Sequence, residues 1–252
     1  MNIMDLHTHT QFSDGDGTVE DIVRVAKEKG IKVGISDHVF CSKMNDMDAI
    51  ENYLNALDQY DVYKGVEANM KDIIHWPDRL LHQLDYVISS VHTFYDRHTK
   101  DRIWLSSYFG YRVGHSSSYK KQYKTEDCEY IMEALLQTIE KCFRQSRVDI
   151  YGHCTILPFY DELQGTTFID GWENEILHLC EKYQVALELS GLWKAPSTHL
   201  IKKALNKNIQ FSLGSDCHRL TEICNLDYPL TLIQKLNIPQ HRMFTIKNNK
   251  QS

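Results

Sequence analysis

Two histidines separated by a single residue lie near the start of the chain, in the stretch DLHTHTQFSDG. Residues two apart on a β-strand face the same side, so His7 and His9 can bind one metal ion together. Asp216 and His218 repeat this spacing in the later stretch GSDCH. Neutral imidazoles and carboxylates are accepted as ligands by zinc, manganese and iron. The two pairs therefore predict metal chemistry.

Further candidate ligands each stand at the end of an apolar run. They are His38, Glu67, His92 and His153. Taken singly, such a histidine is more often a hydrogen-bonded core residue than a ligand, but together with the two pairs these residues stand at the ends of six different runs. This is more than a single ion with roughly four to six ligands can use, so we expect two or three divalent ions, manganese, zinc or iron. Asp5 and Asp37 are expected to orient neighbouring imidazoles.

The elements that must position these residues are visible as a repeating pattern. Seven apolar runs read as strands, at 3–9, 31–36, 62–68, 85–92, 148–154, 185–191 and 209–218. Helical spacing of apolar residues separates several of them, at 18–30, 130–143, 172–183 and 198–208. Alternating strands and helices imply parallel βα units, and about seven such units favour a closed or nearly closed α/β barrel in a single domain. In parallel barrels catalytic groups collect at the C-terminal ends of the strands, where the candidate ligands stand.

Composition limits the classes of partner. The chain has 252 residues, 42% of them hydrophobic, and a formal net charge of −6. This charge argues against nucleic acid and anionic membranes as partners and favours a small molecule. No apolar run approaches the roughly 20 residues that cross a bilayer, so we expect a cytoplasmic protein. The seven cysteines show no C-x-x-C spacing and are expected to be reduced, with Cys154 and Cys217 turned away from the site.

A long segment without regular periodicity, 93–127, follows His92. It is interpreted either as an active-site insertion that covers the site or as a solvated surface excursion with partial helix. It contributes two candidates for binding a substrate's phosphate, Arg97 and His98. Lys194 and Arg219 are the other two, because they lie beside predicted strand ends. Trp193 is expected to serve packing.

The ordered series of motifs resembles the polymerase and histidinol phosphatase (PHP) superfamily. DLHTHTQFSDG matches its first motif and SDH its second, while GVEA, SSVH, YGH and GSDCH match later ones, between positions 5 and 218. The resemblance implies a distorted (β/α)7 TIM-like barrel, the PHP fold, as one metal-dependent phosphoesterase domain over 1–252. It also implies a trinuclear site, in which Asp16 competes with Asp14 for one ligand position. The implied ligands are His7, His9, Glu67 and Asp216 for one ion, Glu67, His92 and His153 for a second, and Asp14, His38 and His218 for the third.

Within the superfamily, GVEANM and LELSGLWKAPS are most similar to the histidinol-phosphatase branch. This implies a hydrolase that converts L-histidinol phosphate to L-histidinol and phosphate in histidine biosynthesis. A metal-bridging hydroxide would attack phosphorus, and Glu67, Asp216 and His218 would be the catalytic residues. Relatives often carry an arginine after the YGH motif, where this chain reads CTILPFY. Two alternatives therefore stay open: another phosphomonoester, or an amidohydrolase or deacetylase reaction at the same site. The sequence does not indicate an oligomeric state.

Overall fold

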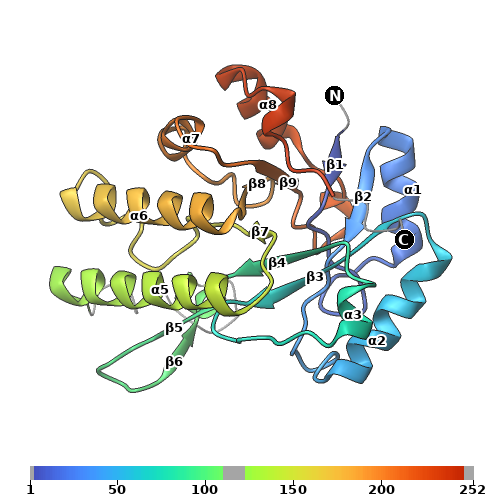
Figure 1. The fold of residues 1–252 in the computed structure, drawn as a ribbon, viewed down its shortest axis with the longest axis horizontal. Helices are drawn as coiled ribbons and strands as arrows, with labels where there is room; N and C mark the ends of the chain where they lie inside the picture. Colours follow the sequence, from blue (N-terminus) through green and yellow to red (C-terminus); the bar gives the residue numbers. More distant parts are fainter. Residues whose placement is uncertain (1–2, 110–122, 247–252) are drawn as a thin grey trace.

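Seven parallel strands form the centre of the molecule (Figure 1). The structure, a computed structural model, describes residues 3–109 and 123–246. The sheet order is β1–β2–β3–β4–β7–β8–β9, so that each strand of the main sheet lies beside its predecessor in the chain. These strands are β1 (Met4–Asp5), β2 (Lys32–Ile35), β3 (Tyr63–Asn69), β4 (Tyr86–Ser90), β7 (Ile150–Tyr151), β8 (Ala186–Ser190) and β9 (Phe211–Gly214). All seven predicted strands are confirmed.

The first and last strands meet and nearly close the barrel. The backbone N–H of Leu6 donates to the carbonyl of Leu213 at 2.9 Å, and that of Asp216 donates to the carbonyl of His7 at 2.7 Å. A parallel bridge between Thr8 and Cys217 continues this pairing past the named strands. The predicted single-domain, nearly closed α/β barrel is thereby confirmed, and the two pairs of candidate ligands are brought side by side.

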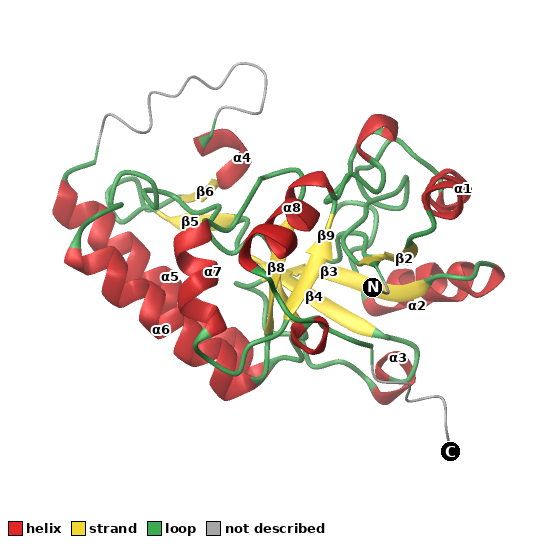
Figure 2. Ribbon diagram, turned by 90° about the horizontal axis from the view of Figure 1, so that it is seen from above, coloured by secondary structure: helices red, strands yellow, loops and turns green. Residues whose placement is uncertain are grey.

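Helices surround the strands, with α5 and α6 adjacent on one side and α1 and α2 on the other (Figure 2). The predicted start of α1 is confirmed: the Thr18 hydroxyl accepts from the N–H of Asp21, and the Asp21 carboxylate accepts from the N–H of Thr18, each at 3.2 Å. The helices are α1 (Val19–Lys29), α2 (Met47–Ala56), α3 (Asp78–Leu81), α4 (Leu105–Tyr108), α5 (Thr125–Gln145), α6 (Thr167–Tyr183), α7 (Thr198–Leu205) and α8 (Asp227–Leu236). In the described residues, no helix is both long and apolar enough to cross a membrane.

The barrel interior is filled below the strand ends. One apolar cluster joins residues on or next to β1, β4, β7 and β8, and contacts between such non-neighbouring strands must cross the barrel. Tyr86 is its largest buried member. A Cβ at Gly34 or Gly65 would lie 2.3 or 2.2 Å from atoms of the Tyr86 side chain, so these glycines make room for the ring. Packing of this kind gives the strand ends a rigid base.

The segment 93–127 is more regular than its sequence indicates. β5 (Thr93–Tyr95) and β6 (Arg102–Trp104) pair as an antiparallel hairpin, and α4 follows directly. Phe94, Leu105 and Tyr108 are buried in the main core, which anchors the described part of the segment to the barrel. Part of the predicted cover over the site, residues 110–122, lies outside the described residues.

Candidate metal centre

The Glu67 carboxylate stands at the centre of the predicted ligands. It lies on β3 and is buried, with an exposed fraction of 1%. Oε2 is 2.9 Å from His38 Nδ1, 3.3 Å from His7 Nε2 and 3.5 Å from His9 Nε2, whereas Oε1 is 3.2 Å from His92 Nε2 and 3.4 Å from His153 Nε2. The bridge between His38 and Glu67 continues the pairing of β2 with β3, which explains why their side chains meet.

Asp216 provides a second buried carboxylate after β9. Its Oδ1 lies 3.2 Å from His9 Nε2 and 3.5 Å from His7 Nε2. Its Oδ2 accepts a hydrogen bond of 2.6 Å from Trp193 Nε1. Trp193 therefore does more than the packing expected of it, because it fixes the orientation of a candidate ligand.

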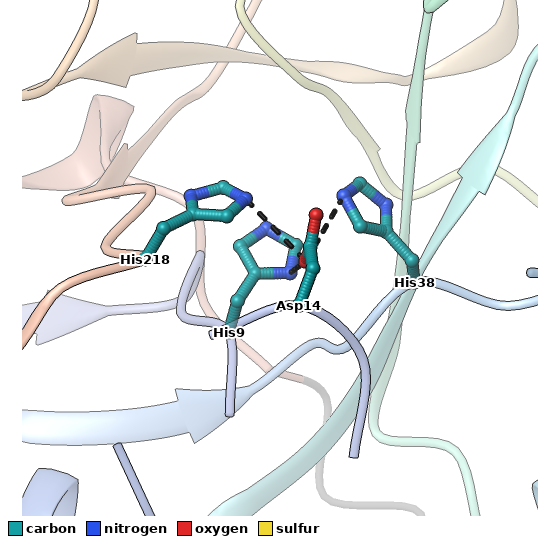
Figure 3. Close-up of side chains that lie close together, drawn as sticks. All are labelled: His9, Asp14, His38 and His218. Atoms are coloured by element: carbon teal, nitrogen blue, oxygen red, sulfur yellow. Dashed lines mark ion pairs between the residues drawn. The ribbon is translucent and has the colours of Figure 1, made fainter. Parts of the chain in front are cut away.

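Asp14 faces three histidines from the loop after β1 (Figure 3). Its Oδ1 lies 3.5 Å from His218 Nε2, 3.7 Å from His38 Nε2 and 4.0 Å from His9 Nδ1. A Cβ at Gly15 would lie 2.4 Å from the carbonyl oxygen of His9, so this backbone excludes a side chain at the next position. Asp16, the competing candidate, does not belong to this group.

The predicted ligands form three tight groups that overlap. Each group has ligand atoms within 4.8 Å of one another: His7, His9 and Asp216; His38, Glu67 and His92; and His9, Asp14, His38 and His218. These groups differ in part from the three sets that the family resemblance implied, because His9 and His38 each belong to two groups. His153 lies outside all three and approaches the centre through Glu67.

Unpaired buried atoms at the centre match the chemistry of divalent ions. Nε2 of His7, both ring nitrogens of His9 and both carboxylate oxygens of Glu67 are buried and make no hydrogen bond. A buried polar atom without a partner costs about 1–3 kcal/mol, so folded proteins rarely leave such atoms unmatched. Imidazole nitrogens and carboxylate oxygens are the ligand atoms of zinc, manganese and iron sites. The residues present therefore fit such ions.

The charges at the centre shift several pKa values. Burial alone would raise the pKa of Glu67, but the histidines around it, His7 first, hold it well below its usual range. Burial, followed by repulsion from His38 and His218, lowers the pKa of His9 to about 3. Burial also opposes the charged form of His218, yet Asp14 and Asp216 outweigh it and raise the pKa of His218 to about 9.

Asp5 and Asp37 do not orient imidazoles as expected. Asp37 accepts from the backbone and hydroxyl of Thr10, both at 2.7 Å, and from the backbone and hydroxyl of Ser13. Asp5 accepts from the backbone N–H of Ser215 at 2.8 Å. The expectation for both residues was wrong, because their carboxylates are used by backbone N–H groups and hydroxyls of the loops. Asp37 thereby shapes the turn that presents Asp14.

A cavity of about 660 Å³ opens from the centre. Its walls include Trp104, Leu105 and Phe109, so the described part of segment 93–127 borders the site. Lys71, just beyond β3, is the only lysine or arginine among the described residues that line it. Sequence reasoning missed Lys71 because a lysine in a loop after a strand is usually a solvated surface residue.

The four predicted phosphate-binding residues do not line this cavity in the described part of the chain. Arg97 and His98 both pair with Asp127 at the start of α5, His98 at 3.0 Å. Lys194 and Arg219 are exposed and follow cavity residues directly in sequence. Cys154 and Cys217 are buried in apolar clusters, as expected.

The fold and the site together define a parallel α/β barrel whose strand ends gather carboxylates and imidazoles. The family model described as PHP domain matches residues 5–191, and the chain belongs to this family. A "Probable phosphatase" from Shewanella loihica is 35% identical, over 96% of this chain and 88% of the relative. Another, from Caldanaerobacter subterraneus subsp. tengcongensis, is 24% identical, over 98% of this chain and 89% of the relative.

A solved structure supports the fold. The crystal structure of histidinol phosphate phosphatase from Lactococcus lactis subsp. lactis, complexed with zinc, L-histidinol and phosphate, superposes with a TM-score of 0.58. The alignment covers 93% of each chain at 18% identity. At this identity the likeness shows a shared fold.

Proposed function

We propose that this protein is a metal-dependent phosphatase that hydrolyses a small phosphomonoester. The observation that carries the proposal is the gathering of unpaired buried imidazoles and carboxylates at the mouth of a cavity of about 660 Å³. Family membership and the two relatives named probable phosphatases support the same reaction. L-Histidinol phosphate is the first candidate substrate, because the Lactococcus enzyme was solved with L-histidinol and phosphate. The reaction would then serve histidine biosynthesis in the cytoplasm.

Two or three divalent ions, manganese, zinc or iron, would be held by the nine predicted ligands. These are His7, His9, Asp14, His38, Glu67, His92, His153, Asp216 and His218. Bound ions lower the pKa of a ligated water and neutralise phosphate oxygens. Glu67 is the natural shared ligand, because its two oxygens face different histidines.

The chain itself would bind and orient the substrate. Lys71 is placed to attract the phosphate or another anionic group, and the apolar walls exclude water from the body of the substrate. Asp216 and His218 both line the cavity and would hold an ion there, and a water on that ion could supply the proton that the leaving alcohol needs. The apolar wall at Trp104 suits a ring-bearing substrate better than a polyol.

A substrate panel tests this proposal. The protein is purified with manganese, zinc or iron and assayed on L-histidinol phosphate, p-nitrophenyl phosphate, sugar phosphates and acylated amines. We expect phosphate release, with kcat/KM for histidinol phosphate at least about a hundredfold above the other esters, or about 2.7 kcal/mol in transition-state stabilisation. A flat profile among phosphates would reject histidinol phosphate. Hydrolysis of amides with inert phosphates would reject the phosphatase.

A further inference from the structure

A charged residue lies completely buried inside the wall of the barrel, on a strand that carries none of the predicted ligands. Glu188 lies in the middle of β8 and has an exposed fraction of 0%. A buried carboxylate is costly unless its oxygens receive hydrogen bonds.

Both oxygens of Glu188 face residues of the metal centre. Oε1 lies 2.6 Å from Nδ1 of His7, which follows β1. Oε2 accepts a hydrogen bond from the backbone N–H of His153, which follows β7. The Glu188 side chain thus joins His7 and His153, two candidate ligands that are 146 positions apart in the sequence.

The contact with His7 determines which ring nitrogen can bind a metal ion. A carboxylate can only accept, so Nδ1 of His7 must carry the proton that lies between the two side chains. In the neutral ring, Nε2 then keeps its lone pair. That atom points toward Glu67 Oε2 at 3.3 Å and Asp216 Oδ1 at 3.5 Å, and it makes no hydrogen bond. Glu188 thereby directs the lone pair of His7 to the carboxylates of the centre.

The neighbouring strand leaves room for this arrangement. A Cβ at Gly214 on β9 would lie 2.0 Å from Glu188 Oε1 and 2.5 Å from Cβ of His7. Any larger residue at this position would separate the two side chains or displace the strand. The absence of a side chain at Gly214 is therefore required by the contact between Glu188 and His7.

We propose that Glu188 is a positioning residue for the metal centre. It holds His7 in the tautomer that leaves Nε2 free, and it fixes the backbone from which His153 reaches Glu67. The proposal rests on the metal-binding part of the proposed function and is independent of the substrate. Groups that orient metal-bound histidines in this way typically contribute about 10–100-fold to metal affinity.

The test is the replacement Glu188→Gln, which keeps the shape and removes the charge. Glutamine has one acceptor oxygen and one NH₂ donor, so it cannot accept from both His7 and His153. If its oxygen stays on the N–H of His153, its NH₂ faces Nδ1 of His7 and drives the ring proton to Nε2. We expect the apparent Kd of the metal-stripped variant for Zn²⁺, measured in competition with a chromophoric chelator, to rise about 10–100-fold.

Asp96→Asn is the matched control, because it makes the same change from carboxylate to amide. Asp96 is buried at 4%, accepts from the backbone N–H of His98 and from the hydroxyl of Tyr123, and lies outside the candidate metal-binding groups of the described residues. This control should keep the Zn²⁺ affinity even where it lowers the melting temperature. A Zn²⁺ affinity of Glu188→Gln within twofold of the parent protein would overturn the proposal.

A second measurement does not depend on the folding of any variant. Nitrogen-15 NMR of the zinc-loaded parent protein, with labelled histidine, reports which ring nitrogen of His7 carries the proton. We expect protonated Nδ1 and metal-bound Nε2. The reverse tautomer would overturn the proposal. Neither experiment uses a substrate, so a failure of the phosphatase assay leaves both results interpretable.

Discussion

Replacement of Glu67 by glutamine removes the one carboxylate that faces histidines on every side of the centre. Its oxygens lie within 3.5 Å of ring nitrogens of five histidines: His7, His9, His38, His92 and His153. Glutamine keeps the volume, but its NH₂ group cannot bind a cation. Of two ions that share this carboxylate, one would lose its ligand and the other would keep only a neutral amide oxygen.

The size of the effect follows from this sharing. Loss of a group that merely orients a ligand lowers metal affinity about 10–100-fold, and loss of a direct ligand should cost no less. For two ions the product is about 10²–10⁴. We therefore expect kcat/KM to fall by about 10³ at limiting metal, which corresponds to about 4 kcal/mol. Elemental analysis should find at least one ion fewer per chain than in the parent protein.

The assay compares Glu67→Gln with Asp96→Asn, which makes the same change from carboxylate to amide at a buried residue outside the candidate metal-binding groups of the described residues. Both variants are loaded with the same metal, dialysed, and measured for metal content, kcat/KM and circular dichroism. The control should retain its ions and its activity. If Glu67→Gln is folded, keeps the full number of ions and has near-normal kcat/KM, then the carboxylate does not bridge ions and the assigned centre is wrong.

Three further outcomes are expected. Trp104→Ala should raise KM for aryl phosphates about tenfold, or about 1.4 kcal/mol, because Trp104 lines the cavity. Tyr95→Ala is the control and should leave KM unchanged: Tyr95 is 49% exposed and Trp104 is 48% exposed, but Tyr95 does not line the cavity. Lys71→Met should raise KM for phosphomonoesters about tenfold with little change in kcat, while Lys194→Met should leave KM unchanged. A raised KM in Lys194→Met with an unchanged KM in Lys71→Met would show that Lys194, the residue suggested by the sequence, binds the phosphate. Metal binding at pH 7.5 should release protons, because His218 has a pKa of about 9 and must lose its proton to bind an ion, so metal affinity should rise from pH 6 to pH 8. Calorimetry in two buffers of different ionisation enthalpy measures the proton release. Equal binding heats in the two buffers would contradict this prediction.

The residues that could be predicted from the sequence share one property: they follow an apolar run. His38, His92 and His153 each come directly after a recognisable strand, and parallel strands deliver their C-terminal ends to one face of a barrel. Their meeting therefore needs only the topology, not the details of packing. The same reasoning found both pairs that begin at His7 and Asp216.

Residues whose role depends on side-chain direction could not be predicted. Glu188 is in the middle of a strand, and no local pattern tells whether its side chain points to the metal centre or to a helix. Lys194 and Arg219 were suggested because they adjoin Trp193 and His218 in the sequence. The side chains of adjacent residues usually point in different directions. Of these four residues, Trp193 and His218 lie on the cavity wall, whereas Lys194 and Arg219 do not.

The hydrogen-bonding state of the centre explains why so large a hydrophobic frame surrounds it. The two ring nitrogens of His9 are buried without a hydrogen bond, and each opposes folding by about 1–3 kcal/mol before any ion is bound. Apolar clusters between the strands and the surrounding helices, the cap of α1 and the interior packing of Tyr86 offset this cost without help from the metal. The ligands are thus held close together in advance, so metal binding does not have to order the chain as it does in a small zinc-dependent domain. The folding stability lost at the strand ends is regained when ions bind there, because ions that bind only the folded protein stabilise it.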